Sequence, residues 1–408
     1  GLFDEMCEYN AINYQKNDSQ ANANQALAAA RKSMVLLKND DDILPVAANA
    51  KIAVIGEFAR TPRYQGGGSS HITPTKMTSF LDTLAARGVD VAFAPGFTLD
   101  LEPADPALEA EAVETAKNAD VVLMFLGLPE AAESEGFDRE TLDIPAKQVE
   151  LLKAVAAENK NIVVVLSNGS VVSVAPWAGN AKGILESWLL GQAGGPALAD
   201  VIFGKVSPSG KLAQTIPMNI NDDPSMINWP GEEGHVDYGE GVFVGYRYYD
   251  TYDKAVDYPF GFGLSYGTDF SQTITSFDDS GDEIVMTVRV ANNGSVAGKD
   301  VVQVYHNPPY TDFDIQNRIE KPTANLVEFS KTGEIAPGAY EDVTLVDIIT
   351  FLDYGVTFER KYPLHHSRSF RHYIHRCLVV LFGFLISGRF GYGNSDQSAF
   401  FRYPHPRY

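Results

Sequence analysis

The chain has 408 residues, a length that allows two or three domains with a hydrophobic core each. Hydrophobic residues make up 45% and charged residues 21% of it, which excludes a disordered chain and a disulfide-stapled miniprotein. The formal net charge of −21 repels nucleic acid and anionic lipid, so we expect neither a nucleic acid nor a membrane as a partner.

The two cysteines, Cys7 and Cys377, lie too far apart in sequence to suggest a disulfide framework, which favours a reducing compartment. The first twenty residues lack a basic segment followed by an apolar run, and nowhere does the chain hold about 18 consecutive apolar residues. These features predict a cytoplasmic protein. Because the first residue is Gly1 rather than Met, a signal upstream of it stays open.

An alternation of helix and strand patterns runs through the first half of the chain. Small apolar residues predict a helix over residues 20–37. Short, nearly continuous apolar runs follow, which are typical of strands covered on both faces: 51–56, 89–94, 120–126 and 161–166. Helical patterns lie between and after them, at 78–87, 106–118, 146–159 and 195–203. This alternation predicts a layered α/β sandwich with a mostly parallel sheet over residues 35–215.

A Gly-rich loop, residues 64–71, lies downstream of the first of these strands. Its glycines let the backbone approach a ligand, and its Gln and Ser side chains offer neutral hydrogen bonds to hydroxyl groups. Nucleotide binding is the alternative. The loop has neither the Gly-Lys-Ser/Thr of a P-loop nor a G-x-G-x-x-G that opens a helix, which argues against it.

The densest polar cluster, residues 133–140, follows the predicted strand 120–126 directly. We therefore expect it at a carboxyl edge of the sheet, where open α/β sheets bind ligands. A carboxyl group beside a cation and other carboxylates can have its pKa moved toward neutrality and act as a general acid. A solvated acidic turn is the alternative. No Gly-x-Ser-x-Gly elbow occurs, and no His or Cys spacing fits a metal site.

The pattern changes after a Pro-, Gly- and Asp-rich stretch, residues 217–238. Residues 283–290 and 299–305 alternate polar and apolar side chains, and Asn-Asn-Gly at 292–294 is a turn signal between them. They predict a small antiparallel domain over residues 270–346, an immunoglobulin-like or fibronectin-type sandwich, joined to the α/β region by residues 216–269.

The tail, residues 347–408, has a different composition. It carries eight lysine or arginine residues against four acidic ones and holds five of the eight histidines, with neither helical nor strand periodicity. We expect a segment that does not fold with the rest, from a shifted reading frame. A membrane-surface or metal-binding appendage is the alternative.

These motifs, taken in order, resemble the C-terminal part of glycoside hydrolase family three, of the bacterial β-glucosidase type. The resemblance covers about residues 1–346. Its pieces are Gly1-Leu-Phe-Asp4, Ser33-Met-Val-Leu-Leu-Lys-Asn-Asp40 with Leu44-Pro45, Val54-Ile-Gly56 with residues 65–70, Glu133-Ser-Glu-Gly-Phe-Asp-Arg139, Leu166-Ser-Asn-Gly169, Gly191-Gln-Ala-Gly-Gly195, Ser207-Pro-Ser-Gly-Lys-Leu212, Tyr238-Gly-Glu-Gly-Val-Phe-Val-Gly-Tyr-Arg-Tyr248, Pro259-Phe-Gly-Phe-Gly-Leu-Ser-Tyr266 and Ala297-Gly298 before Val301-Val-Gln-Val-Tyr305.

The resemblance implies a three-part enzyme: a (β/α)8 barrel with an Asp nucleophile, an α/β sandwich with the acid/base Glu, and a fibronectin type III-like domain. It implies a retaining mechanism through a covalent glycosyl-enzyme, with two carboxyl groups about 5–5.5 Å apart. The Glu before Gly in the acidic motif, Glu135, matches the family's acid/base. Glu133 is the rival candidate.

The resemblance also implies a substrate, the terminal β-D-glucosyl residue of an oligosaccharide or glycoside, and no cofactor or metal. The Gly-rich loop would border the sugar, and the end of the acidic motif would orient the catalytic loop. The substrate-binding residues assigned in this way are Gln65, Gly68, Ser69, Ser70, Asp138 and Arg139.

The chain also departs from the family pattern. Residues 1–4 resemble the end of the last barrel helix, so residues 1–34 are expected to be a linker from a barrel that the chain lacks. Without the nucleophile we expect this chain alone to be inactive, with the barrel as its partner. A non-catalytic, sugar-contacting or scaffold fragment of a truncated gene is the alternative. A family-three β-xylosidase or N-acetylglucosaminidase is a second one.

Overall fold

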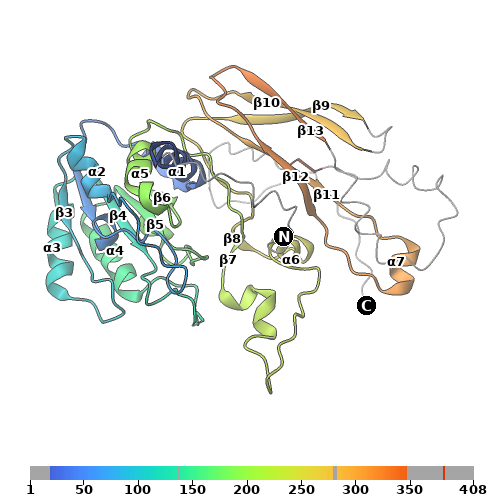
Figure 1. The fold of residues 1–408 in the computed structure, drawn as a ribbon, viewed down its shortest axis with the longest axis horizontal. Coiled ribbons are helices and arrows are strands. Elements are labelled where there is room, and N and C mark those ends of the chain that lie inside the picture. The colour runs from blue at the N-terminus through green and yellow to red at the C-terminus, as the bar shows by residue number, and fades with distance from the viewer. Residues whose placement is uncertain (1–18, 137, 279–282, 347–379, 382–408) are drawn as a thin grey trace, which may run out of the picture.

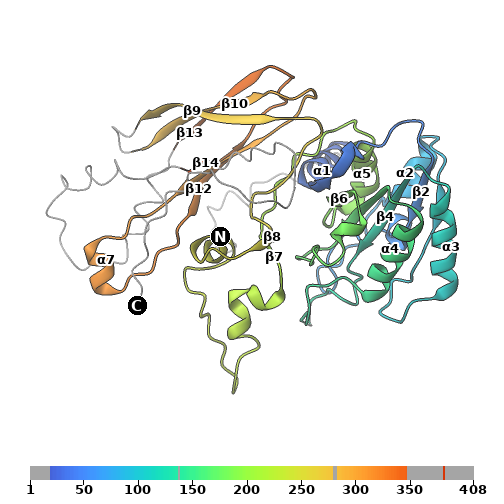
Figure 2. The same ribbon diagram turned by 180° about the vertical axis from the view of Figure 1, so that it is seen from behind.

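Residues 19–136, 138–278, 283–346 and 380–381 are described by the computed structural model of the protein (Figure 1). They form an α/β body, a connecting segment with little regular structure, and a pair of antiparallel sheets. Figure 2 shows the same arrangement from behind, with the α/β body and the antiparallel sheets at opposite ends of the molecule.

A six-stranded sheet forms the centre of the α/β body, in the order β1-β6-β5-β4-β2-β3. β1 runs antiparallel to β6, and all other neighbours are parallel. The strands are β1 (Val35–Asn39), β2 (Ile52–Ile55), β3 (Ala92–Ala94), β4 (Val121–Gly127), β5 (Ile162–Ser167) and β6 (Gly183–Glu186). This topology confirms the predicted α/β class with a mostly parallel sheet.

Two groups of helices cover the sheet. α1 (Ser19–Ser33) and α2 (Phe80–Ala86) both pack on α5 (Gly194–Ile202), and α3 (Pro106–Lys117) packs on α4 (Ala146–Glu158). Figure 1 shows the two groups on opposite sides of the strands. Because the central strands are covered on both faces, every residue of β5 is buried, as its continuous apolar sequence predicted.

A buried carboxylate ties the first group of helices together. Asp200 of α5, whose side chain is 1% exposed, accepts hydrogen bonds from Arg31 of α1 and from Arg87, the residue after α2, the latter at 2.8 Å. A buried charge is stable only when it is paired, so these two cations fix the positions of α1 and α2 relative to α5.

The predicted helix over residues 20–37 is too long. α1 ends at Ser33, and the residues from Met34 to Leu37 are at most 2% exposed and enter β1. Four consecutive buried residues cannot lie on one face of a helix, whereas a strand that pairs with β6 and is covered on both faces buries all of them. β6 itself, with the sequence Gly-Ile-Leu-Glu, carried too short an apolar run to be predicted.

The strand order places the ligand-binding edge of this sheet. The chain leaves β2 toward β3 on one side and then returns to β4 on the other, so the order reverses between β2 and β4. In open α/β sheets, ligands bind outside the carboxyl ends of the strands at such a reversal. The segments that follow β2 and β4 contain the Gly-rich loop and the acidic motif.

The C-terminal part contains two three-stranded antiparallel sheets within the described ranges, β13-β10-β9 and β12-β11-β14. Their strands are β9 (Phe270–Asp278), β10 (Val285–Asn292), β11 (Val301–His306), β12 (Asn325–Lys331), β13 (Tyr340–Val346) and β14 (Val380–Leu381), with α7 (Asp312–Asn317) between β11 and β12.

One apolar cluster joins the two sheets, because it contains Val288 of β10, Val343 of β13 and Val302 of β11. The turn predicted after β10 is present, since the side chain of Asn292 accepts a hydrogen bond from the Gly294 N–H at 3.0 Å. β10 and β11 nevertheless lie in different sheets rather than pairing with each other. The likeness to a fibronectin type III domain and the domain boundaries stay predictions.

The connecting segment contains β7 (Ile216–Pro217), two short 3-10 helices (Ile220–Asp222 and Pro224–Ile227), α6 (Tyr246–Thr251) and β8 (Val256–Tyr258), which pairs with β7. Of the tail, only β14 lies within the described residues, and its backbone pairs with β11. No helix in the described ranges combines the length and apolar character needed to cross a bilayer.

Candidate functional site

The Gly-rich loop after β2 and the acidic loop after β4 touch at the ligand-binding edge of the sheet. Gly67 and Ser134 form a parallel β-bridge, and the N–H of Glu135 donates to the carbonyl oxygen of Gly67 at 3.4 Å. The two motifs that the sequence singled out therefore belong to one site.

Two glycines permit this close approach. A Cβ on Gly67 would lie 2.6 Å from the Cγ of Glu130 and from the Oγ of Ser134. A Cβ on Gly68, whose φ is +94°, would lie 2.5 Å from the Cβ of Glu135. Only glycine fits both the space and the backbone angle at residue 68, so Gly68 determines where Glu135 can sit.

Glu135 presents an exposed carboxylate that Ser69 holds. Its Oε2 accepts hydrogen bonds from the Ser69 N–H at 2.7 Å and from the Ser69 hydroxyl. The two hydrogen bonds from Ser69 stabilise the charged form and hold the pKa of Glu135 below its ordinary value. The sequence predicted a pKa moved toward neutrality. That expectation is wrong for this carboxylate, because the hydrogen bonds from Ser69 favour its charged form and outweigh the opposing effect of burial.

Glu133, the rival candidate, is committed to the scaffold. Its carboxylate accepts four hydrogen bonds. The donors are the Arg63 guanidinium at 2.5 Å, the N–H groups of Gly169 at 2.8 Å and of Ser170 at 2.6 Å, and the Ser170 hydroxyl. Burial raises the pKa of Glu133, but the hydrogen bonds from Ser170 and Gly169 and the charge of Arg63 outweigh burial, so the pKa lies below its ordinary value. A carboxylate with this many donors is unsuited to exchange protons with a substrate.

Arg139 anchors the other end of the acidic loop. Its Nη1 donates to the Ser170 hydroxyl at 2.9 Å and to the carbonyl oxygen of Val171 at 2.7 Å. Ser170 therefore contacts both Glu133 and Arg139, the two residues that bracket Glu135. Burial lowers the pKa of the Arg139 guanidinium. This arrangement supports the orienting role expected for Arg139, whereas Asp138 is exposed.

The remaining predicted binding residues divide into two kinds. Gln65 closes its own loop, because its amide donates to the Ile72 carbonyl oxygen at 3.0 Å and accepts the Ile72 N–H at 3.0 Å. Ser70 is exposed beside Ser69. The structure thus uses Gln65 and Ser69 to shape the site, and leaves the Ser70 side chain open to a ligand.

Sequence reasoning missed Arg63 and Ser170 as parts of the site. Arg63 has a side chain that is only 6% exposed, and it also donates to the carbonyl oxygens of Leu128 and Glu133, both at 2.7 Å. Ser170 stood in what looked like an ordinary strand-to-helix turn. A lone Arg and a lone Ser give no spacing signal, because the partners that tie them to the acidic loop and to Leu128 lie at least 31 residues away in the sequence.

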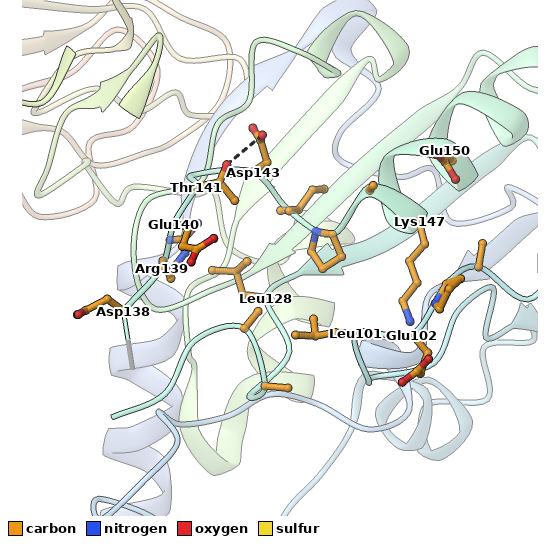
Figure 3. A pocket seen from close by; sticks show the side chains of 17 residues that line it. Leu101, Glu102, Leu128, Asp138, Arg139, Glu140, Thr141, Asp143, Lys147 and Glu150 are labelled. Atoms are coloured by element: carbon orange, nitrogen blue, oxygen red, sulfur yellow. Dashed lines mark hydrogen bonds between the residues drawn. The ribbon is translucent and has the colours of Figure 1, made fainter. Parts of the chain in front are cut away.

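Two pockets flank the end of the acidic loop. One, of about 760 Å³, is lined by Leu128 and by residues at the start of α4. Figure 3 shows that the Asp138 carboxylate points away from Leu128 and from Lys147 of α4. The other, of about 620 Å³, extends from Arg139 to Trp229 and Tyr246 of the connecting segment. Among the described residues, no group of three or more His, Cys, Asp and Glu is placed to hold a metal ion.

Residues 34–266, more than half of the chain, match the Glycosyl hydrolase family 3 C-terminal domain. Both loops of the site lie inside this match. The chain therefore belongs to glycosyl hydrolase family 3, as the resemblance of its motifs predicted.

Two curated relatives show different substrates within this family. An exo-α-(1→6)-L-arabinopyranosidase of Bifidobacterium longum is 67% identical over 330 residues, which are 79% of this chain and 43% of the relative. The thermostable β-glucosidase B of Acetivibrio thermocellus is 45% identical over 334 residues, 80% of this chain and 43% of the relative.

The crystal structure of a family 3 β-glucosidase of Bifidobacterium adolescentis, at 74% identity, superposes with a TM-score of 0.78. The superposition covers 83% of this chain and 49% of that one. The chain therefore spans about half the length of the relatives that it matches, or somewhat less.

Gly68→Ala tests how the two loops fix Glu135. The new Cβ is expected to push Glu135 off Ser69, and the loss of these hydrogen bonds should raise the pKa of Glu135 toward its ordinary value. A pH titration of the labelled glutamate carboxyl carbons by NMR measures this shift. Gly66→Ala is the matched control, because its Cβ would meet only Ser70 Oγ at 3.8 Å. An unchanged titration of Glu135 in Gly68→Ala would contradict the geometry.

Proposed function

We propose that this chain supplies the acid/base half of a retaining glycoside hydrolase that removes terminal β-D-glucosyl residues. The observation that carries the proposal is the place of Glu135: an exposed carboxyl group at the strand-order reversal, on a loop anchored at both ends. The nucleophile would come from a part of the protein outside this chain.

The chemistry follows from this placement. In the first step the protonated Glu135 gives its proton to the leaving glycosidic oxygen as the nucleophile attacks the anomeric carbon. In the second step the Glu135 carboxylate takes a proton from the attacking water, which displaces the nucleophile and restores both groups. Ser69 would hold the charged form between the two steps.

A general acid at neutral pH requires a pKa higher than the one this exposed carboxylate has. Covering Glu135 with protein and substrate would remove the water around it and raise its pKa. We therefore propose that a barrel domain covers this face and completes the acid as well as the nucleophile. Ser70 and Asp138 would then face the sugar, with Gln65, Gly68 and Arg139 shaping the loops.

The glycosyl group has two candidates. The relative from B. longum is named for α-L-arabinopyranosyl groups and the one from A. thermocellus for β-glucosides. Both substrates carry an equatorial glycosidic bond on a pyranose ring, so one acid position serves either of them. β-Glucoside hydrolysis is proposed first because the motif of Glu135 is of the β-glucosidase type.

A second candidate function, a non-catalytic sugar-contacting or scaffold fragment, is favoured by one observation. In the chain as described, Glu135 is an ionised carboxylate bonded to Ser69 rather than a proton donor. A chain that works without a barrel would keep this state.

Complementation distinguishes the two functions. The chain is mixed with the separately produced N-terminal part of the B. longum relative, the part that it does not match, and hydrolysis of 4-nitrophenyl β-D-glucopyranoside and α-L-arabinopyranoside is measured. We expect activity only in the mixture. A folded chain that stays inactive with both substrates, in a mixture shown to associate, would support the fragment instead.

A further inference from the structure

A buried carboxyl group lies directly behind the site, and none of the roles assigned above uses it. Glu186 is the last residue of β6, pairs in register with Leu166 of β5, and is 1% exposed. Its neighbour Asn168, just after β5, is fully buried. Both residues sit at the same edge of the sheet as the acidic loop, on the side away from solvent.

A continuous chain of hydrogen bonds leads from Glu186 to the acidic loop. The Glu186 Oε2 accepts the side-chain amide of Asn168 at 3.1 Å, and this amide also donates to the carbonyl oxygen of Ser170 at 3.0 Å. Ser170 in turn donates to Glu133 and accepts from Arg139, so both ends of the loop that carries Glu135 meet at it.

The second oxygen of Glu186 supports the other loop of the site. Its Oε1 accepts the N–H of Trp188 at 2.9 Å. Trp188 has a φ of +58°, an uncommon backbone angle for a residue other than glycine, so this hydrogen bond stabilises a strained turn. Three residues on, the N–H of Gly191 donates to the carbonyl oxygen of Tyr64, at the start of the Gly-rich loop that carries Ser69.

We propose that Glu186, together with Asn168, is a positioning residue for Glu135, because it holds from behind both loops whose contact fixes that carboxyl group. The role rests on the proposed function in so far as Glu135 is the acid/base. Glu186 contacts no substrate in this role and acts only through Ser170 and the turn at Trp188.

The chemistry of the cluster favours a neutral Glu186. Burial raises the pKa of Glu186 to about 8, hydrogen bonds from Trp188 and Asn168 oppose this effect, and the negative charge of Glu133 adds to it. Glu133 is the charged group that faces Glu186, and the cations Arg63 and Arg139 are engaged by Glu133 and Ser170.

The hydrogen-bond count agrees with a neutral Glu186. Asn168 Oδ1 is buried and has no partner, whereas each carboxyl oxygen of Glu186 already has an N–H donor. A proton on Glu186 brings one O–H donor into this cluster and removes a buried charge that has no cation as its partner in the described residues. Ionisation of Glu186 would place a buried negative charge beside that of Glu133, and this would destabilise the cluster that holds Ser170 and the acidic loop.

The first test uses the chain alone. Glu186→Met removes both oxygen atoms that accept hydrogen bonds. Glu186→Gln keeps the size of the side chain and the neutrality of the protonated acid, but it keeps only one of the two accepting oxygens. By hydrogen exchange with mass spectrometry, peptides covering residues 128–139 and 167–172 are expected to exchange about tenfold faster in Glu186→Met, with peptides of β10 unchanged. Asp257→Asn is the matched control: burial also raises the pKa of Asp257, and it accepts a backbone N–H, that of Ala175, away from the loop.

The second test is the pH dependence of the melting temperature of Glu186→Gln and of the wild-type chain. An unfolded glutamate loses its proton near pH 4.5, whereas native Glu186 keeps it to about pH 8, so the unfolded state binds fewer protons in this window. Glu186 therefore lowers the stability of the wild type as pH rises between these values, and Glu186→Gln lacks this contribution. We expect the melting temperature of Glu186→Gln relative to wild type to rise from pH 5 to pH 8. A difference in melting temperature that stays constant from pH 5 to pH 8 would show that Glu186 is not neutral in the folded chain.

The third test uses the complemented enzyme. If Glu186 positions Glu135, Glu186→Met should lower kcat about 10²-fold with KM nearly unchanged, since a displacement of about 1 Å in a catalytic group has this effect. Glu186→Gln should recover part of kcat and keep it to higher pH than the wild type. The proposal would be overturned if residues 128–139 of folded Glu186→Met exchanged hydrogen at the same rate as in the wild type, or if its kcat were unchanged. If the complemented wild type had no activity, this would count against the proposed function. The first two tests would still decide whether Glu186 holds the two loops.

Discussion

Glu135→Gln is expected to lower the hydrolysis of 4-nitrophenyl β-D-glucopyranoside by the complemented enzyme about 10²–10⁴-fold, the usual contribution of general acid/base catalysis. Gln has nearly the same shape as Glu and can accept one hydrogen bond from Ser69, but it can neither give a proton to the leaving oxygen nor take one from water. The loss should therefore appear in kcat/KM, with the fold and stability of the chain retained.

The dependence on the leaving group separates this role from simple damage to the site. The 2,4-dinitrophenolate group of a 2,4-dinitrophenyl glucoside departs without protonation, so formation of the glycosyl-enzyme from this substrate should be nearly as fast in Glu135→Gln as in the wild type. Azide, which attacks without a general base, should then speed turnover of the variant and release glycosyl azide. Equal losses with both leaving groups and no effect of azide would show that Glu135 is not the acid/base.

Glu133→Ala is expected to lower the free energy of unfolding by about 3–5 kcal/mol, because removal of one partner leaves the charge of Arg63 buried and unpaired. The Arg63 side chain is 6% exposed, and the N–H groups of Gly169 and Ser170 also lose their acceptor. Denaturant unfolding at pH 7 measures the change. Glu140→Gln, an exposed residue of the same loop, is the control and should change stability by less than about 0.5 kcal/mol.

The effect of Glu133→Ala should depend on pH. The folded state holds the pKa of Glu133 below its ordinary value of 4.5, so the stabilisation by the charged form is fully present above about pH 4.5. It is lost as pH falls through the lower pKa of the folded state. The difference between wild type and variant should therefore be largest near neutral pH and shrink below pH 4.5. A difference independent of pH would show that packing rather than charge stabilises this site.

Much of the α/β fold was predictable because it depends on local patterns. The runs that became β2, β4 and β5 are continuous and apolar, and their burial on both faces follows from this composition. The helical pattern at 106–118 was confirmed as well: α3 begins at Pro106, and Asp105 is its N-cap in the structure. The helix assigned to residues 20–37 failed at Met34 because the pairing partner of the following strand lies far along the chain, in β6.

The acidic loop was recognised from its motif, and its neighbours were not. Glu135 and the Gly-rich loop stand out as short, unusual sequences, and the family match confirms the recognition that they support. Arg63, Ser170 and Glu186 do not stand out, because each is one ordinary residue whose role depends on a partner from another strand. The expected rise in the pKa of Glu135 failed for a related reason: sequence shows which charges are near in the chain, but not how much water surrounds them.

The sequence by itself determined the family, the class of the α/β fold and the loop that carries the candidate acid, because apolar periodicity and short motifs are properties of neighbouring residues. Only the tertiary structure decided which of the two glutamates is exposed and which is bound into the scaffold. Glu133 and Glu135 are two residues apart and chemically identical. Folding brings Arg63 and Ser170 to the first and leaves the second exposed beside Ser69, and this difference in contacts and solvation suits only the second to the acid/base role proposed for it.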